Sequence, residues 1–338
     1  MIEVAPGIYQ MTLPLADSSL GHINTYLVRG DRENLLVDTG WNTEETFRSL
    51  EKQLAEAGTR FEDITWIVLT HIHADHYGLA GRLKPLSPAK IAAHYLEKER
   101  IDSRFINITR LLEELDQWLH VNGVPFDELS GLQAASLRMT RRVVPCQPDV
   151  SLRGGEIISI GSFNFEVLWT PGHAPGHISL YEPVQKILLS GDHILPDITP
   201  NVSLQPQSGA NPLADYLNSL TALIELRVDL ILPGHQQPFR GWQARIDQII
   251  RHHQQRNAEI LNAIKNEAKT AYQISTEITW AGDVSGAGWQ DLPPLDRRLA
   301  VLETLAHLEY MRFGGKLDKS SRNSLIYYQP EQSVKKLK

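Results

Sequence analysis

The sequence predicts a layered α/β protein, and two patterns carry this prediction. Short apolar segments bounded by Gly, Asp or Asn alternate with segments whose apolar residues recur at helical spacing, which is the order of elements in layered α/β folds. The chain of 338 residues, with 42% hydrophobic and 22% charged residues, has an ordinary globular composition. Its length leaves room for one large domain and a smaller one.

The part of the chain up to about residue 95 shows this alternation clearly. A helix is expected at residues 43–57, because Phe47, Leu50 and Leu54 recur at helical spacing. Thr43 supplies a capping side chain at its start. Branched residues and flanking turn residues predict strands at 23–28, 34–37 and 64–69.

A mostly helical segment, residues 96–142, interrupts the alternation. We interpret it as an insertion that forms a lid and sets the size of the substrate. After it, short apolar runs predict strands again, and one amphipathic run predicts a helix at residues 213–226. The expected strands are residues 157–160, 163–169, 178–181, 187–189 and 228–232.

The C-terminal part differs in charge. Residues 240–338 carry 15 Lys or Arg and 11 Asp or Glu, whereas the whole chain has a net charge of −7, so we expect two units with different surfaces. We place a catalytic domain at residues 1–240 and a second domain at 241–338. Its polar first helix should expose His252 and His253 to solvent. The elements expected there are helices at 242–268, 271–278 and 295–313 and a hairpin at 316–328, an order similar to a winged helix.

Composition excludes several classes of protein. No stretch approaches the roughly 18 apolar residues of a membrane-spanning helix, and no basic start precedes an apolar block at the N-terminus. We therefore expect a cytoplasmic protein without a membrane partner. The single cysteine, Cys146, excludes an internal disulfide and a thiolate cage. A metal site in this chain would need nitrogen and oxygen ligands.

Residues 71–76 read His-Ile-His-Ala-Asp-His and follow the strand expected at 64–69. Alternation along an extended chain puts His71 and His73 on one side, and the following turn presents Asp75 and His76 to a neighbouring position. Imidazole nitrogen and carboxylate oxygen suit zinc and similar divalent ions. This run therefore predicts ligands for two adjacent metal ions.

Three further residues of the same chemical kind also follow predicted strands. His173 follows the strand at 163–169, Asp192 follows 187–189, and His235 follows 228–232. Loops at strand ends are where a rigid sheet positions functional groups. We expect these three residues to complete the metal site.

The motifs THIHADH, TPGHAPGH, SGD and LPGH, in this order, resemble the signatures of the metallo-beta-lactamase fold hydrolases over roughly residues 5–245. The resemblance implies a four-layer α/β/β/α sandwich with two metal ions at one edge of the paired sheets. Zinc is expected, with iron or manganese as alternatives. The C-terminal order resembles a branch of this superfamily with a winged-helix-like extension. The implied ligands are His71, His73 and His173 for one ion, Asp75, His76 and His235 for the other, and Asp192 as the bridge.

Further residues are expected near the ions. Asp38 and His177 are interpreted as partners of ligating imidazoles, although an Asp in a DTG sequence can also fix a turn and His177 can also be a packing residue. Asp75 is the candidate catalytic residue, which would orient the attacking hydroxide and move a proton. A basic group at the end of the insertion either attracts an anionic substrate or favours a helix C-terminus. The candidate substrate contacts are His22, Tyr77, Arg138, Arg141 and Arg142.

These residues favour a dinuclear metal hydrolase that acts on an ester, a thioester, a lactone or a phosphodiester. One alternative is a mononuclear iron oxidoreductase similar to the persulfide dioxygenases of the superfamily, but the intact LPGH motif favours the hydrolase. Another is a nuclease whose C-terminal domain contacts nucleic acid, but the sequence contains no dense basic stripe. The expected partner is a small-molecule substrate, and a homodimer remains open.

Overall fold

The computed structural model describes residues 1–16, 18, 20–280 and 288–331. The chain forms two compact units, the first from residues 1–108, 138–200 and 218–246, the second from the described residues among 109–137, 201–217 and 247–338. No helix of this described part combines the length and apolarity that crossing a bilayer requires. Its helices are α1 (Glu44–Glu56), α2 (Ala74–Tyr77), α3 (Ala80–Leu83), α4 (Tyr95–Lys98), α5 (Thr109–Val121), α6 (Phe126–Thr140), α7 (Pro212–Leu223), α8 (Trp242–Ala263), α9 (Ala271–Ser275) and α10 (Pro294–Phe313).

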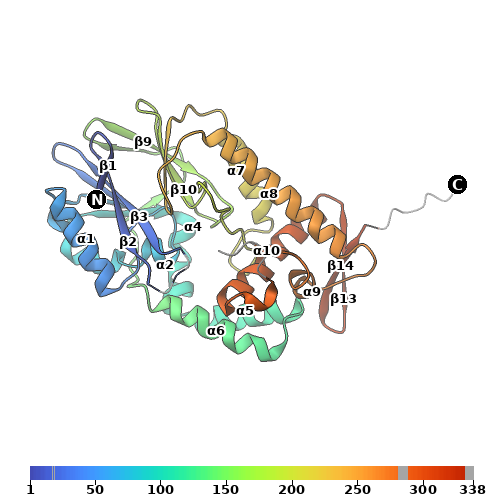
Figure 1. Ribbon diagram of the computed structural model, residues 1–338. Helices are drawn as coiled ribbons and strands as arrows, with labels where there is room; N and C mark the ends of the chain where they lie inside the picture. The colour runs from blue at the N-terminus through green and yellow to red at the C-terminus, as the bar shows by residue number, and fades with distance from the viewer. Residues whose placement is uncertain (17, 19, 281–287, 332–338) are drawn as a thin grey trace. The chain divides into compact units, whose positions relative to one another are not determined.

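The first unit contains two β-sheets (Figure 1). The larger sheet runs in the order β1 to β7, antiparallel from β1 to β4 and parallel from β4 to β7. The smaller sheet has the order β12-β11-β10-β9-β8, in which β11 and β12 are parallel and the other neighbours antiparallel. The strands are β1 (Ile2–Ala5), β2 (Ile8–Pro14), β3 (His22–Arg29), β4 (Asn34–Val37), β5 (Trp66–Val68), β6 (Lys90–His94), β7 (Val150–Leu152), β8 (Ile157–Ile160), β9 (Phe163–Trp169), β10 (Ile178–Glu182), β11 (Ile187–Gly191) and β12 (Leu230–Pro233).

The two sheets pack face to face through an apolar core. Tyr26 and Val28 enter this core from β3, and Phe165 and Val167 enter it from β9. Leu27, between the two β3 residues, points the opposite way into a second core, because successive side chains of a strand alternate between faces. The larger sheet is therefore buried on both faces, which explains why its strands read as nearly continuous apolar runs.

Helices cover the outer faces of both sheets. On the larger sheet, α1 contributes Phe47, Leu50 and Leu54 to the second core, as the sequence predicts, and it lies against β2 (Figure 1). On the smaller sheet, the hydroxyl of Ser219 in α7 donates a hydrogen bond to the carbonyl of Pro171, after β9. These layers form the predicted α/β/β/α sandwich.

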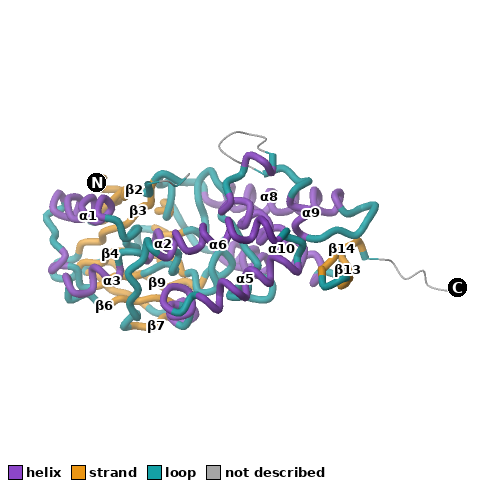
Figure 2. Tube along the Cα trace, turned by 90° about the horizontal axis from the view of Figure 1, so that it is seen from below, coloured by secondary structure: helices purple, strands orange, loops and turns teal. Residues whose placement is uncertain are grey.

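The second unit is mainly helical and includes the antiparallel hairpin of β13 (Leu317–Arg322) and β14 (Leu325–Pro330) (Figure 2). Residues 109–137 of the predicted insertion belong to this unit. There the hydroxyl of Tyr272 donates to Glu128 of α6, and its backbone N–H donates to the carbonyl of Asn122. The domain boundary at residue 240, the winged-helix likeness and the lid role stay predictions, and residues 281–287 and 332–338 lie outside the described part.

Most predicted elements are confirmed. The strands expected at 34–37, 157–160 and 163–169 coincide with β4, β8 and β9, and the other predicted strands of the sandwich differ from the observed ones by at most two residues at either end. Strands β1, β2, β6 and β7 have no counterpart among the predicted elements. Strand β6 reads Lys-Ile-Ala-Ala-His, which is poor in branched residues, and β7 has three residues, so neither has a clear strand pattern.

The prediction that His253 faces solvent is wrong. Its side chain is 1% exposed, and its Nδ1 lies 3.2 Å from Nε2 of His307. The other ring nitrogen of His307 lies 2.8 Å from Oδ1 of Asn257. Burial, together with the charges of His252 and Arg256, lowers the pKa of His253 to about 3. The polar composition of α8 does not reveal this contact, because His307 is far away in the sequence.

We expect the second unit to lose stability in mild acid. An unfolded chain protonates histidine below about pH 6.5, whereas folded His253 stays neutral down to a pH of about 3. Between these values the unfolded state binds more protons, so the free energy of unfolding falls as the pH falls, by about 2 kcal/mol for this group at about pH 5.

Thermal unfolding followed by circular dichroism, from about pH 7.5 to about pH 5, measures this effect. His253→Gln should make the fall of Tm with pH shallower, whereas His120→Gln, on α5 of the same unit and partly exposed, serves as the control. Parallel Tm curves for wild type and His253→Gln would contradict the expectation.

Candidate metal centre

Loops that follow strands of both sheets meet at one edge of the first unit. In the larger sheet, Asp38 follows β4 directly and His71 lies shortly after β5. In the smaller sheet, Asp192 follows β11 and His235 lies shortly after β12. Within each pair the two strands are parallel, so their carboxyl ends point the same way. Carboxyl ends of parallel strands are a common place for ligand sites.

His71, His73 and His173 form one group of converging nitrogens. Nδ1 of His73 lies 2.8 Å from Nε2 of His71 and 2.9 Å from Nε2 of His173. Ligand atoms of the three residues lie within 4.8 Å of one another, close enough to hold one metal ion. The first two residues reach the same side because they are separated by one residue at the end of a strand.

Asp75, His76 and His235 form another group of the same kind. Nε2 of His235 lies 3.2 Å from Oδ2 of Asp75, and Nε2 of His76 lies 3.9 Å from the same oxygen. Asp192 lies between the groups. Its Oδ2 is 3.4 Å from Nε2 of His76, 3.5 Å from that of His235 and 3.6 Å from that of His173.

The protonation of His235 provides a test of whether a cation fits here. Its Nδ1 lies 2.8 Å from the carbonyl oxygen of His22, and because a carbonyl only accepts, Nδ1 must carry the proton. In the neutral ring Nε2 is then an unprotonated lone pair that faces Asp75 and Asp192. A lone pair beside two carboxylates is repulsive unless a proton or a metal ion lies between them.

Three buried atoms of this cluster agree with that conclusion. Among the described residues, Nε2 of His76, Nε2 of His235 and Oδ1 of Asp192 are buried and have no hydrogen-bond partner. Unpaired buried polar atoms are rare in folded proteins. Their common location indicates that a cation belongs among them, and the nitrogen and oxygen donors fit zinc and similar divalent ions.

The charges within the cluster shift pKa values in opposite directions. Burial lowers the pKa of His71 well below its ordinary value, and neighbouring imidazoles lower it further. Burial also acts to lower the pKa of His235, but Asp192 and Asp75 outweigh it and raise that pKa to about 10. The pKa of Asp192 is well below its ordinary value, because His235 and His76 outweigh the effect of burial. The Asp192 side therefore has an excess of negative charge that favours a cation.

Part of the cluster is exposed to solvent. His71 and His76 are fully buried, and His235 is 1% exposed, whereas the Asp75 side chain is 17% exposed and that of His173 is 10% exposed. His73 is also partly exposed. Solvent therefore reaches the cluster at His73, Asp75 and His173, and also at Asp192, whose side chain is 10% exposed.

Asp38 supports His76 from behind. Its Oδ2 lies 2.7 Å from Nδ1 of His76, and its two oxygens accept hydrogen bonds of 2.8 Å from the backbone N–H and hydroxyl of Thr70. With Nδ1 donating to the carboxylate, Nε2 of His76 is left free to bind a metal. Asp38 has a φ of 62°, a left-handed conformation that Asp tolerates better than most residues.

Other contacts hold the loops of the smaller sheet. Nε2 of His177 accepts a hydrogen bond of 3.1 Å from the backbone N–H of Asp192, and its Nδ1 lies 2.8 Å from the hydroxyl of Thr170. The side chains of Asn24 and Tyr26, both in β3, donate to the carbonyl of Pro233. His177 thus orients the Asp192 backbone, and the larger sheet holds the loop that carries His235.

The predicted substrate contacts have different locations. Tyr77 is fully buried, and its hydroxyl donates to the carbonyl of Cys146 and accepts from its N–H, so the prediction that it contacts substrate is wrong. His22 touches the cluster through its backbone carbonyl. Arg142 lies over the ring of Trp41, 4.7 Å from its centre. Arg138 and Arg141 are exposed, and a role for the arginines in binding substrate stays a prediction.

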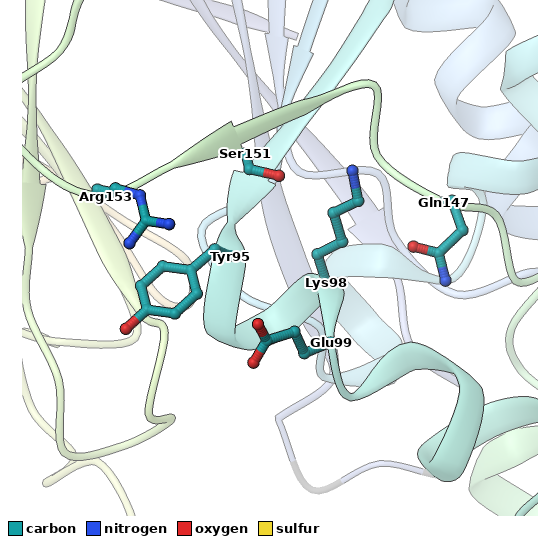
Figure 3. Close-up of a pocket in the computed structure, with 6 residues that line it drawn as sticks. All are labelled: Tyr95, Lys98, Glu99, Gln147, Ser151 and Arg153. Atoms are coloured by element: carbon teal, nitrogen blue, oxygen red, sulfur yellow. The ribbon is translucent and has the colours of Figure 1, made fainter.

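Sequence reasoning misses Thr70, which donates to Asp38. It also misses Asn24, Tyr26 and Glu97, which bond to backbone groups of the ligand loops. The cavity in Figure 3, about 420 Å³, lies beside α4, and none of the proposed ligands lines it. Glu97 belongs to the same short helix, but its carboxylate bonds to the backbone of the ligand loops. The identity of such residues depends on tertiary contacts that no local motif records.

Comparisons with known proteins place the chain among metal-dependent hydrolases. It is 31% identical to the probable metallo-hydrolase YqjP of Bacillus subtilis, over 77% of this chain and 81% of that protein. It is 29% identical to the human acyl-coenzyme A thioesterase MBLAC2, over 64% of this chain and 74% of that protein. A crystal structure of a metallo-beta-lactamase family protein from Thermus thermophilus superposes with a TM-score of 0.83 and 32% identity, covering 97% of this chain and 100% of that one.

Substitution of Gly234 should disrupt the second group of ligands. A Cβ at this position would lie 2.5 Å from Oδ1 of Asp192 and 2.9 Å from Cε1 of His76. We expect Gly234→Ala to weaken metal binding at least about tenfold, measured by titration with zinc and elemental analysis. Gly131→Ala, where a Cβ meets nothing within 4 Å, is the control. Unchanged affinity in Gly234→Ala would argue against this placement of the ligands.

The family itself follows from a match that covers most of the sandwich. The model of the metallo-beta-lactamase superfamily matches residues 19–235, a range that begins before β3 and ends at His235. It includes all seven residues that the structure gathers at the sheet edge. The chain belongs to the metallo-beta-lactamase superfamily and is a metal-dependent hydrolase of that family.

Proposed function

We propose that this protein is a dinuclear metal hydrolase that cleaves acyl thioesters. The observation that carries the dinuclear part is the position of Asp192, whose Oδ2 lies 3.4 Å to 3.6 Å from imidazole nitrogens of both ligand groups. An oxygen so placed is suited to bridge two ions. Zinc is the proposed metal, with iron or manganese as alternatives, since the donors are nitrogen and oxygen.

Each group has a defined task in this proposal. His71, His73 and His173 would hold one ion, and Asp75, His76 and His235 would hold the other. Two bound ions would supply Lewis acidity and lower the pKa of water, so that a nucleophile exists at neutral pH. Asp38 and the carbonyl of His22 keep Nε2 of His76 and of His235 free for binding, by taking the proton on the other nitrogen.

Asp75 is the proposed proton-transfer residue. Its side chain is 17% exposed, and its Oδ2 lies 3.2 Å from Nε2 of His235. A carboxylate in this position can accept a proton from the attacking water and return it to the departing thiolate, so that water and thioester give a carboxylic acid and a thiol.

The names of two relatives support a thioester as the substrate. Besides the human acyl-coenzyme A thioesterase, an atrochrysone carboxyl ACP thioesterase of Aspergillus fumigatus is 24% identical over 79% of this chain and 65% of that protein. Esters, lactones and phosphodiesters can be attacked by the same centre. The choice of a thioester over these other substrates therefore rests on the relatives, and an assay of all four classes tests it.

A substrate panel tests the proposal. Purified protein with two equivalents of zinc is assayed with acetyl-coenzyme A, palmitoyl-coenzyme A, a lactone, bis-p-nitrophenyl phosphate and single-stranded RNA. We expect turnover of a coenzyme A thioester well above the others. Preferential cleavage of RNA would favour the nuclease, and cleavage of the lactone or the phosphate ester alone would move the proposal to that class.

Replacing His235 tests the need for the second group. His235→Ala should lower kcat/KM at least about a hundredfold, because it removes a ligand and leaves Asp75 without its neighbour. Elemental analysis should fall from two ions to one. Full turnover in this variant, or one iron and no second metal in the wild type, would favour a mononuclear oxidoreductase.

A further inference from the structure

Glu97 is a buried carboxylate next to the metal centre, and none of the tasks above uses it. Its side chain is 1% exposed. It lies on α4, which follows β6, and β6 pairs in parallel with β5, the strand that leads to His71. The topology therefore places Glu97 beside the first ligand loop.

Both oxygens of Glu97 accept hydrogen bonds from the ligand loops. Oε2 accepts from the backbone N–H of Ile72 at 3.2 Å, and Oε1 accepts from the backbone N–H of Gly176 at 2.8 Å. Ile72 lies between His71 and His73, and Gly176 lies in the loop of His173. One carboxylate therefore ties together the two loops that carry the whole first group.

The second contact depends on glycine. A Cβ on Gly176 would lie 2.7 Å from Cγ of Glu97 and 2.9 Å from Nδ1 of His94. The loop approaches the carboxylate this closely only because the position has no side chain. The contact of this loop with Glu97 thus requires glycine at position 176.

The charge of Glu97 acts on one nearby cation, Arg104. Arg104 follows in a π-helical turn, Asp102–Ile106. Burial lowers the pKa of Arg104, and the charge of Glu97 acts against this effect. Arg104 also contributes to the low pKa of His73, after burial and His173. The carboxylate, the guanidinium and the first ligand group therefore interact electrostatically, and removal of the carboxylate removes the negative charge that acts on Arg104.

We propose that Glu97 is a positioning residue that holds His71, His73 and His173 in register as one metal site. This proposal rests on the dinuclear centre described under the proposed function. It predicts selectivity, because Glu97 bonds to both loops of the first group, whereas Asp38 bonds to His76 of the second. Loss of Glu97 weakens the first site, and loss of Asp38 weakens the second.

The test compares Glu97→Gln with Asp38→Asn in the full-length protein. Each variant is loaded with cobalt(II), and the bound metal is counted by elemental analysis while the visible spectrum reports the ligand set. We expect Glu97→Gln to bind one ion at wild-type affinity and the other about 10- to 100-fold more weakly. The visible spectrum of the ion that Glu97→Gln retains should differ from the spectrum of the ion that Asp38→Asn retains. The sum of these two spectra should match the spectrum of the wild type.

A matched control separates positioning from general stability. Glu182 is also 1% exposed and accepts a backbone N–H, that of Gln185, but in the smaller sheet away from the loops. Glu182→Gln should keep both cobalt sites. Gly176→Ala disturbs the same contact from the other side and should copy Glu97→Gln, which also preserves the test if Glu97→Gln does not fold.

Two results would overturn the inference. These are wild-type affinity for both ions in Glu97→Gln and Gly176→Ala, or equal weakening of both sites. A wild type that binds fewer than two ions contradicts the dinuclear centre itself, and one that binds two ions but cleaves no thioester contradicts the substrate. The last two outcomes concern the dinuclear centre and the substrate, and they are distinct from the weakening of one site that tests Glu97.

Discussion

The close approach of imidazole nitrogens and carboxylates at one sheet edge, which favours positive charge between them, is the interaction on which the site depends. Nε2 of His235 faces two carboxylates, and its other nitrogen is committed to a carbonyl. Such an arrangement costs free energy unless positive charge enters it. With a proton or a metal ion in place the groups attract each other, and the surrounding backbone contacts fix their positions.

The supporting contacts come from both sheets. Asp38 and Thr70 of the larger sheet support His76, while Asn24 and Tyr26 hold the loop of His235 in the smaller sheet. The inter-sheet core is therefore part of the site, because a shift of one sheet over the other would separate ligands that must lie within a few ångströms. A close-packed core resists such shifts. Stability and site geometry are coupled through the same residues.

The sequence is sufficient to predict the fold class and to name the residues that gather at the edge, because His71, His73, Asp75 and His76 form a local run at the end of a strand. It is insufficient where a role arises from tertiary contact. Glu97 has no motif around it, and its role depends on Ile72 and Gly176 from two other segments. The prediction that Tyr77 contacts substrate is wrong for the same reason, since adjacency to His76 in the sequence does not determine the direction of its ring.

The left-handed backbone of Asp38 has a consequence for how this chain can change. A φ of 62° costs a non-glycine residue about 1 kcal/mol or more, and glycine would remove that cost. Glycine has no carboxylate, however, so the substitution that relaxes the turn would leave His76 without its partner. The N–H and hydroxyl of Thr70 would also lose their buried acceptor, and each unmade buried hydrogen bond costs about 1 to 3 kcal/mol. Stability and the metal centre therefore both retain the strained aspartate, and even a library screened only for Tm would be expected to keep it.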